Sequence, residues 1–146
     1  ALSRPLMKRV LFLLAFAAAA PALAQVGDAG ARQRGLVSLS QIFGELHHVR
    51  RTCDPDREAD IWRNRMKRLI DLEEPPFNVR DQMVAAFNDG YVSAQARFPY
   101  CDSESESYAA ARAYAGEALV SNLTAPLYAA RRGEDANDVA VFRGVE

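Results

Sequence analysis

The chain has 146 residues, of which 18 are basic and 19 acidic, and its formal net charge is −1. A charge so close to balance gives no overall bias toward nucleic acid or anionic lipid, and we expect no nucleic-acid partner. The length suits a single domain with a hydrophobic core of its own.

Residues 1–24 have the pattern of an export signal. A short basic segment precedes the apolar run 10–20, which is shorter than the roughly 20 residues that a helix needs to cross a bilayer. A proline and a small-x-small motif follow, so cleavage is predicted between Ala24 and Gln25. We therefore expect a signal peptide over residues 1–24, a periplasmic or secreted product, and no membrane span after signal cleavage.

The rest of the chain divides into three parts by its pattern. Residues 25–37 are glycine-rich without a period and predict a flexible lead-in. Residues 38–132 carry apolar side chains at three- and four-residue spacing, which predicts one helical domain. Residues 133–146 hold a short apolar island but no helical period, so we expect a loose C-terminal tail.

Within the helical domain we expect about four amphipathic helices. Capping boxes that begin at Ser38 and Ser103 mark the starts of the first and the last. Prolines end the second and the third, and the last is expected to kink or end near Pro126. The expected ranges are 38–53, 54–74, 78–98 and 103–126. No strand pattern is present and the connections are short, so the predicted fold is all-α, an up-down bundle.

In an up-down bundle the first and third helices run parallel, so their C-terminal ends lie together. Cys53 ends the first predicted helix and Cys101 follows the third. An exported protein meets an oxidising compartment, where an even number of cysteines favours pairing. We predict a structural disulfide between them, worth roughly 4 kcal/mol for a loop of about 50 residues. A thiol-redox pair is the alternative, but the C-x-x-C spacing typical of such pairs is absent.

Three segments, LSQIFGELHHVRRTC, WRNRMKRLIDLE and AAFNDGYVSAQARFPYC, resemble an uncharacterised family of small exported alphaproteobacterial proteins, known only as a domain of unknown function. The resemblance covers about residues 39–101. Its most specific positions are Leu46, His47, Arg50, Cys53, Trp62, Glu73, Phe87, Asn88, Gly90, Tyr91 and Cys101. It implies export and a compact helical domain with paired cysteines, but no reaction. The position of His48 is usually a tyrosine in that pattern.

The adjacent histidines of LHHVRRTCD raise the question of a metal site. Glu45-x-x-His48 has the spacing of a di-iron bundle, but the other helices supply no second Glu-x-x-His. On the predicted helix, His48 points to solvent and His47 lies on a flank. A zinc site built from His47, Cys53 and Cys101 would lack a fourth ligand, and the C-x-x-C-H motif of covalent haem is absent. We therefore predict no metal and no cofactor.

Two polar features remain as candidates for a site. Arg50 falls on the apolar stripe of the first helix and is predicted to pair with Glu58 across the hairpin, with an anion clamp as the alternative. At the opposite end, an inward Glu73 and a flanking Asn88 lie beside Tyr91. This polar and aromatic set suits either a small-molecule or peptide pocket or a buried polar network. Gly90, in mid-helix, predicts a close helix crossing.

No nucleophile with a nearby base, no paired carboxylates and no phosphate-binding glycine loop can be assembled. The run RNRMKR makes one helix face basic. We expect a small periplasmic binding or accessory module of the cell envelope rather than an enzyme. The expected partner of this module is an envelope protein or an anionic envelope component. The alternative is an enzyme or metal carrier that uses Arg50, Glu73 and Asn88 in an inter-helix cleft.

Overall fold

The computed structural model describes residues 20–143 of the chain, and the surroundings of side chains for residues 29–133. Over this range all the regular elements are helices: α2 (Ala20–Cys53), α3 (Pro55–Glu58), α4 (Ile61–Glu73), α5 (Phe77–Arg97) and α6 (Ser103–Arg143). The chain divides into two units between Gln33 and Arg34, and the bundle discussed below belongs to the second. No helix in the described range is long and apolar enough to cross a membrane.

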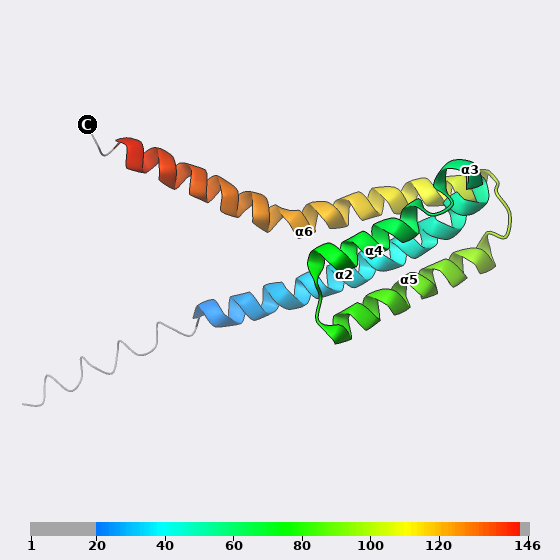
Figure 1. Ribbon diagram of the computed structural model, residues 1–146, viewed down its shortest axis with the longest axis horizontal. Coiled ribbons are helices and arrows are strands. Elements are labelled where there is room, and N and C mark those ends of the chain that lie inside the picture. Colours follow the sequence, from blue (N-terminus) through cyan, green and yellow to red (C-terminus); the bar gives the residue numbers. More distant parts are fainter. Residues whose placement is uncertain (1–19, 144–146) are drawn as a thin grey trace, which may run out of the picture. The chain divides into compact units, whose positions relative to one another are not determined.

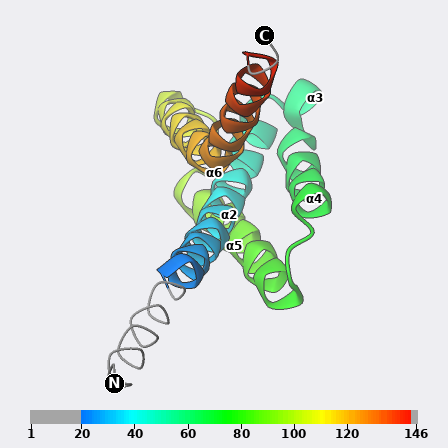
Figure 2. The same cartoon turned by 90° about the vertical axis from the view of Figure 1, so that its left-hand side faces the viewer.

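The second unit is an up-down bundle of α2, α4, α5 and α6, as predicted (Figure 1). Figure 2 shows α2 between the other three long helices. Toward its C-terminal end, α2 packs its apolar side chains against α5 and α6, and Ile42, Leu46 and Val49 form one core cluster with Phe98 and neighbouring alanines. Nearer its start, Leu36 joins a second cluster with residues of α4 and α5. The bundle is therefore built around α2.

The packing of α2 on α5 depends on two glycines. A Cβ atom on Gly44 would overlap the carbonyl oxygen of Phe87 and lie 3.0 Å from the amide nitrogen of Tyr91. A Cβ atom on Gly90 would overlap the carbonyl oxygen of Gln41. The two backbones therefore touch directly, which confirms the close crossing predicted from Gly90. Its counterpart, Gly44, was not predicted.

The helices extend further than their sequence signals predicted. The prediction of a flexible lead-in over 25–37 is wrong, because α2 begins at Ala20 and continues through this segment. The helix continues through the glycines of this segment because tertiary packing stabilises it. Leu36, for example, is buried in the core. The predicted start at Ser38 is therefore also wrong. Residues 1–19 of the predicted signal lie outside the described residues.

Two further boundaries differ from the predictions. The expected second helix is split into α3 and α4 by a turn at residues 59–60. The predicted loose tail is helical as far as Arg143, because α6 continues through Pro126 into an alanine-rich segment that favours helix. Pro126 lies inside α6, and Figure 1 shows a bend in the orange part of this helix. At its start, the backbone N–H of Ser105 donates to Asp102 Oδ1 over 2.8 Å, and Asp102 N–H donates to Ser105 Oγ over 2.9 Å. The capping box thus starts one residue earlier than predicted.

Candidate functional site

The predicted disulfide is present at one end of the bundle. Cys53, the last residue of α2, is joined to Cys101, two residues before α6, with a Cα–Cα distance of 5.0 Å. Among the described residues, one group of side chains has ligand atoms close enough together to hold a metal ion. It consists of these two sulfurs and the carboxylate of Glu106. Since both sulfurs are used by the disulfide, the group serves to join α2 to the start of α6.

The guanidinium of Arg50 lies beside the disulfide and is held by carboxylates from two elements. Arg50 Nη2 lies 2.9 Å from Glu58 Oε1, as predicted, and Nη1 lies 3.0 Å from Glu106 Oε2. Glu58 also accepts a 3.0 Å hydrogen bond from Trp62 Nε1. The hydrogen bond from Arg50 is the main reason that the pKa of Glu58 is lowered. With its donors occupied in this way, Arg50 ties α2 to α3 and α6 rather than presenting a free anion clamp.

Both histidines of the LHHVRRTCD segment are buried, so the prediction that His48 faces solvent is wrong. His48 is 6% exposed, and its Nε2 donates to the carbonyl oxygen of Phe98 over 2.7 Å. The ring of His47 lies 5.7 Å from that of Phe87 and 5.4 Å from that of Tyr91, measured between centroids. The prediction failed because it assumed one buried face, whereas α2 has neighbours on several sides.

Glu45 is buried and forms an ion pair with Arg112 of α6. Its second oxygen accepts a 3.2 Å hydrogen bond from Gln41. The Glu-x-x-His pair that resembled a di-iron motif therefore serves packing, with Glu45 bound to α6 and His48 to the end of α5. No sequence pattern predicted the Glu45–Arg112 pair, which joins residues 67 positions apart.

The buried imidazole of His47 is expected to make stability depend on pH. Its Nδ1 is buried with no hydrogen-bond partner among the described residues. Burial is the main cause of its lowered pKa, assisted by the charges of Arg51, Arg63 and His48 and opposed by Asp60. Because the unfolded chain then takes up the proton more readily, His47 contributes stability above its ordinary pKa, and this contribution is lost as the pH falls.

We therefore expect His47→Phe to lose less stability than the wild type between neutral pH and pH values below the ordinary pKa of histidine. Phenylalanine keeps a ring against Phe87 and Tyr91 but cannot be protonated. The measurement is the free energy of urea unfolding at a series of pH values. Equal pH dependence in the two proteins would contradict the assignment to His47.

The other predicted polar residues do not converge on one cleft. Asn88 is exposed, Glu73 is half-buried at the end of α4, and the half-buried Tyr91 lies edge-on to His48 at 5.5 Å. Because α4 separates Glu73 from Arg50 by the length of a 13-residue helix, about 20 Å, these two cannot act on one small molecule. The expected inter-helix site formed by Arg50, Glu73 and Asn88 is therefore absent from the described bundle.

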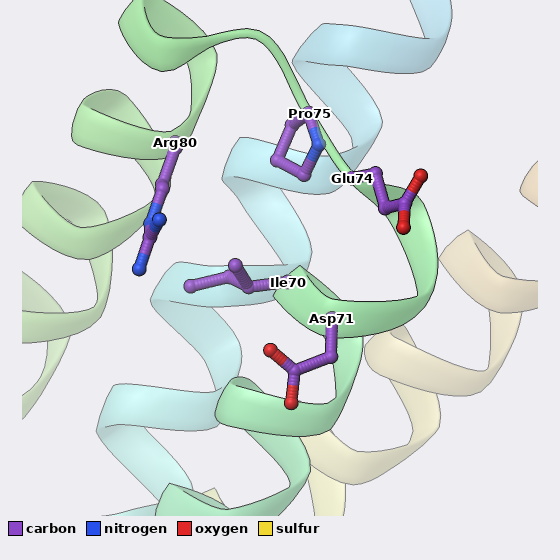
Figure 3. Close-up of a pocket in the computed structure, with 5 residues that line it drawn as sticks. All are labelled: Ile70, Asp71, Glu74, Pro75 and Arg80. Atoms are coloured by element: carbon purple, nitrogen blue, oxygen red, sulfur yellow. The ribbon is translucent and has the colours of Figure 1, made fainter.

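A hollow does occur at the turn between α4 and α5, but it is lined by other residues: Ile70, Asp71, Glu74, Pro75 and Arg80. Figure 3 shows Ile70 and Arg80 approaching it from the two helices. Glu74 ends α4 in the left-handed region at φ 42°, and its N–H donates to Ile70. The hollow lies beside this helix end, and it holds none of the predicted site residues.

The outer side of α4 carries a row of exposed cations: Arg63, Arg65, Lys67 and Arg68. None of the four has a carboxylate partner within the described part of the chain. Arg65 lies 4.3 Å over the ring of Trp62. Arg65 and Arg68 lie on one line of the helix, with Ile61 before them and Leu72 after them. The side chains of Ile61 and Leu72 are 39% and 70% exposed. These four residues, Ile61, Arg65, Arg68 and Leu72, are called the α4 surface below.

Comparison with known proteins places the bundle in a family. No curated protein and no solved structure matches the chain. A family model described as a protein of unknown function (DUF2385) matches residues 32–126. The match includes the second unit of the chain from its start at Arg34 as far as Pro126. Because the match covers well over half of the sequence, the chain belongs to the DUF2385 family.

Proposed function

We propose that the protein is an exported binding module of the cell envelope, and that its α4 surface docks onto the phosphates of anionic phospholipids. The observation that carries this proposal is the row of unpaired cations on α4. Elsewhere in the described bundle, four arginines are paired with carboxylates: Arg50, Arg57, Arg97 and Arg112. The α4 cations lack such partners, so their charge is available to an external anion.

The apolar neighbours of these cations favour a lipid surface over a soluble anion. Arginine binds phosphate through two parallel N–H donors, which suits Arg65 and Arg68 to headgroups. Ile61 and Leu72, on the same line of the helix, remain exposed to water in the free protein. A headgroup layer satisfies both kinds of side chain, because it offers phosphates next to an apolar region. A soluble polyanion would leave Leu72 in water.

The binding test uses the protein expressed with its own residues 1–24, purified from the periplasm, and mixed with lipid vesicles. We expect sedimentation with vesicles of phosphatidylglycerol and phosphatidylcholine, weakened by salt, and none with phosphatidylcholine alone. The double variant R65Q/R68Q is expected to lose this binding. The matched control is R131Q/R132Q, which removes the same charge from two exposed arginines of α6 and should bind like the wild type.

Two results would contradict the lipid proposal. One is equal loss of binding in the two double variants, which would show a response to net charge alone. The other is binding to inorganic polyphosphate without binding to anionic vesicles.

Export is proposed from the pattern of residues 1–24. If it occurs, Edman sequencing of the periplasmic protein should begin at Gln25. Recovery of the protein only from the cytoplasm, with residues 1–24 still attached, would contradict it. This result is independent of the vesicle measurement.

A further inference from the structure

The two sulfurs of the Cys53–Cys101 disulfide lie in different surroundings. Cys53 is half-buried, and its side chain packs against the core cluster that contains Leu46 and Val49. Cys101 is exposed and lies in the connection between α5 and α6. A thiol that approaches from solvent therefore reaches the sulfur of Cys101 first. Access is one of the factors that decide which sulfur of a disulfide a thiolate attacks.

Charged neighbours add to the difference between the two sulfurs. Glu106 Oε1 lies 3.8 Å from Cys101 Sγ, so a thiolate left on Cys101 would be repelled by a carboxylate. Arg50 precedes Cys53 by one turn of α2 and lies on the same side of the helix. A nearby cation stabilises a thiolate, and the more stable thiolate is the better leaving group. Access and charge therefore both favour attack on Cys101 and departure of Cys53.

We propose that the Cys101 sulfur is a site of thiol–disulfide exchange that prefers thiols carrying a positive charge. In the first step, the incoming thiolate forms a bond to Cys101 Sγ while the disulfide breaks. Cys53 Sγ leaves with the electron pair and takes up a proton from water. A second thiolate then attacks the mixed disulfide and releases Cys101, so two thiols are oxidised to a disulfide while the protein disulfide gains their two electrons.

The preference for positive charge follows from the surroundings of Cys101. The segment 98–107 holds three acidic residues and no base. Glu106 is paired with Arg50, but its side chain is 49% exposed against 22% for Arg50, so the carboxylate is the group that an approaching thiol contacts. At such short range a unit charge in water is enough to change a rate severalfold. The site shares no residue with the α4 surface, so this inference stands independently of lipid binding.

The first test identifies the attacked sulfur in the folded wild type. The oxidised protein is incubated briefly with cysteamine, a small thiol that carries an ammonium group, and the reaction is stopped with acid. Free thiols are then alkylated and the peptides are analysed by mass spectrometry. We expect cysteamine on Cys101 and the alkyl group on Cys53. The reverse pattern, or an equal mixture of the two, would overturn the proposal.

The second test measures the charge preference with three thiols that share a two-carbon skeleton: cysteamine, neutral 2-mercaptoethanol and anionic 2-mercaptoethanesulfonate. Each rate of reduction is divided by the rate of the same thiol with a neutral small-molecule disulfide, which removes differences in intrinsic reactivity. At low salt, the normalised rate of cysteamine should exceed that of the sulfonate by about threefold or more, and salt should reduce this ratio. Equal normalised rates, or rates independent of thiol concentration, would overturn the proposal.

The third test assigns the preference to one carboxylate. Glu106→Gln should remove most of it, because the substitution deletes the negative charge beside Cys101 and leaves Arg50 unpaired there. The matched control is Glu117→Gln, which removes another exposed carboxylate of α6 about 16 Å further along the helix and should keep the wild-type ratio. A change in stability would alter the rates of all three thiols alike and so cancels in the ratio. The same preference in both variants would overturn the assignment to Glu106.

Discussion

Replacing Gly44 or Gly90 with alanine is expected to destabilise the bundle by about 3 kcal/mol or more. The added methyl group would meet backbone atoms rather than flexible side chains. On Gly44 it would meet Phe87, and on Gly90 it would meet Gln41 and lie 3.2 Å from the amide nitrogen of Glu45. Since α2 and α5 would have to separate, packing on both sides of the crossing would be lost. The measurement is the free energy of urea unfolding, followed by helical circular dichroism.

Gly116→Ala is the matched control for this prediction. It is also a buried helical glycine, but a Cβ atom there would lie 3.5 Å from Ile42 Cγ2, an ordinary van der Waals distance. The substitution is therefore expected to be neutral or to stabilise by up to about 1 kcal/mol through helix propensity. A similar loss of stability in all three variants would show that the crossing has no special role.

Removing the disulfide is expected to cost about 4 kcal/mol. The bond joins residues separated by 48 positions, and the loop entropy that it removes from the unfolded chain corresponds to about that value. Because domains of this size have net stabilities of about 5–15 kcal/mol, the double variant C53S/C101S should unfold at a much lower urea concentration. Both sites are replaced together so that no free thiol remains to form other bonds.

The control for the disulfide is the reducing agent itself. Dithiothreitol should lower the midpoint of the wild type toward that of the double variant and leave the double variant unchanged. Titration of two free thiols in the native protein would contradict the assignment, as would a midpoint that does not respond to reduction.

The sequence was sufficient to predict features that depend on chain order and on local register. Periodicity and short connections give an up-down bundle, and this topology places Cys53 and Cys101 at the same end. The Arg50–Glu58 pair could also be predicted, because the two residues flank a hairpin and are only 8 positions apart. In each case the contact follows from the order of the helices along the chain and their antiparallel packing.

Features that depend on how a helix is surrounded could not be predicted in this way. A single apolar stripe suggests one buried face, so His48 was expected in solvent and the role of Glu45 was missed. The partner of Glu45, Arg112, is brought near by the rotation of α6 about its own axis, which no local pattern specifies. The predicted start of the first helix at Ser38 was wrong for a related reason. A capping box such as Ser38-x-x-Gln41 is compatible with a helix interior when a longer helix is stabilised by tertiary packing.

The central position of α2 has a consequence for how sequences in this family can diverge. From Gly44 to Val49, six consecutive residues of α2 are buried, so a substitution on any side of the helix there disturbs a neighbour. The outer helices α4, α5 and α6 each keep positions in contact with water, where exchange of one side chain for another costs little. We therefore expect mutational tolerance to be lowest in the middle of α2 and highest on the outer helices. New binding properties would then arise on the outer helices, around an interior that changes slowly.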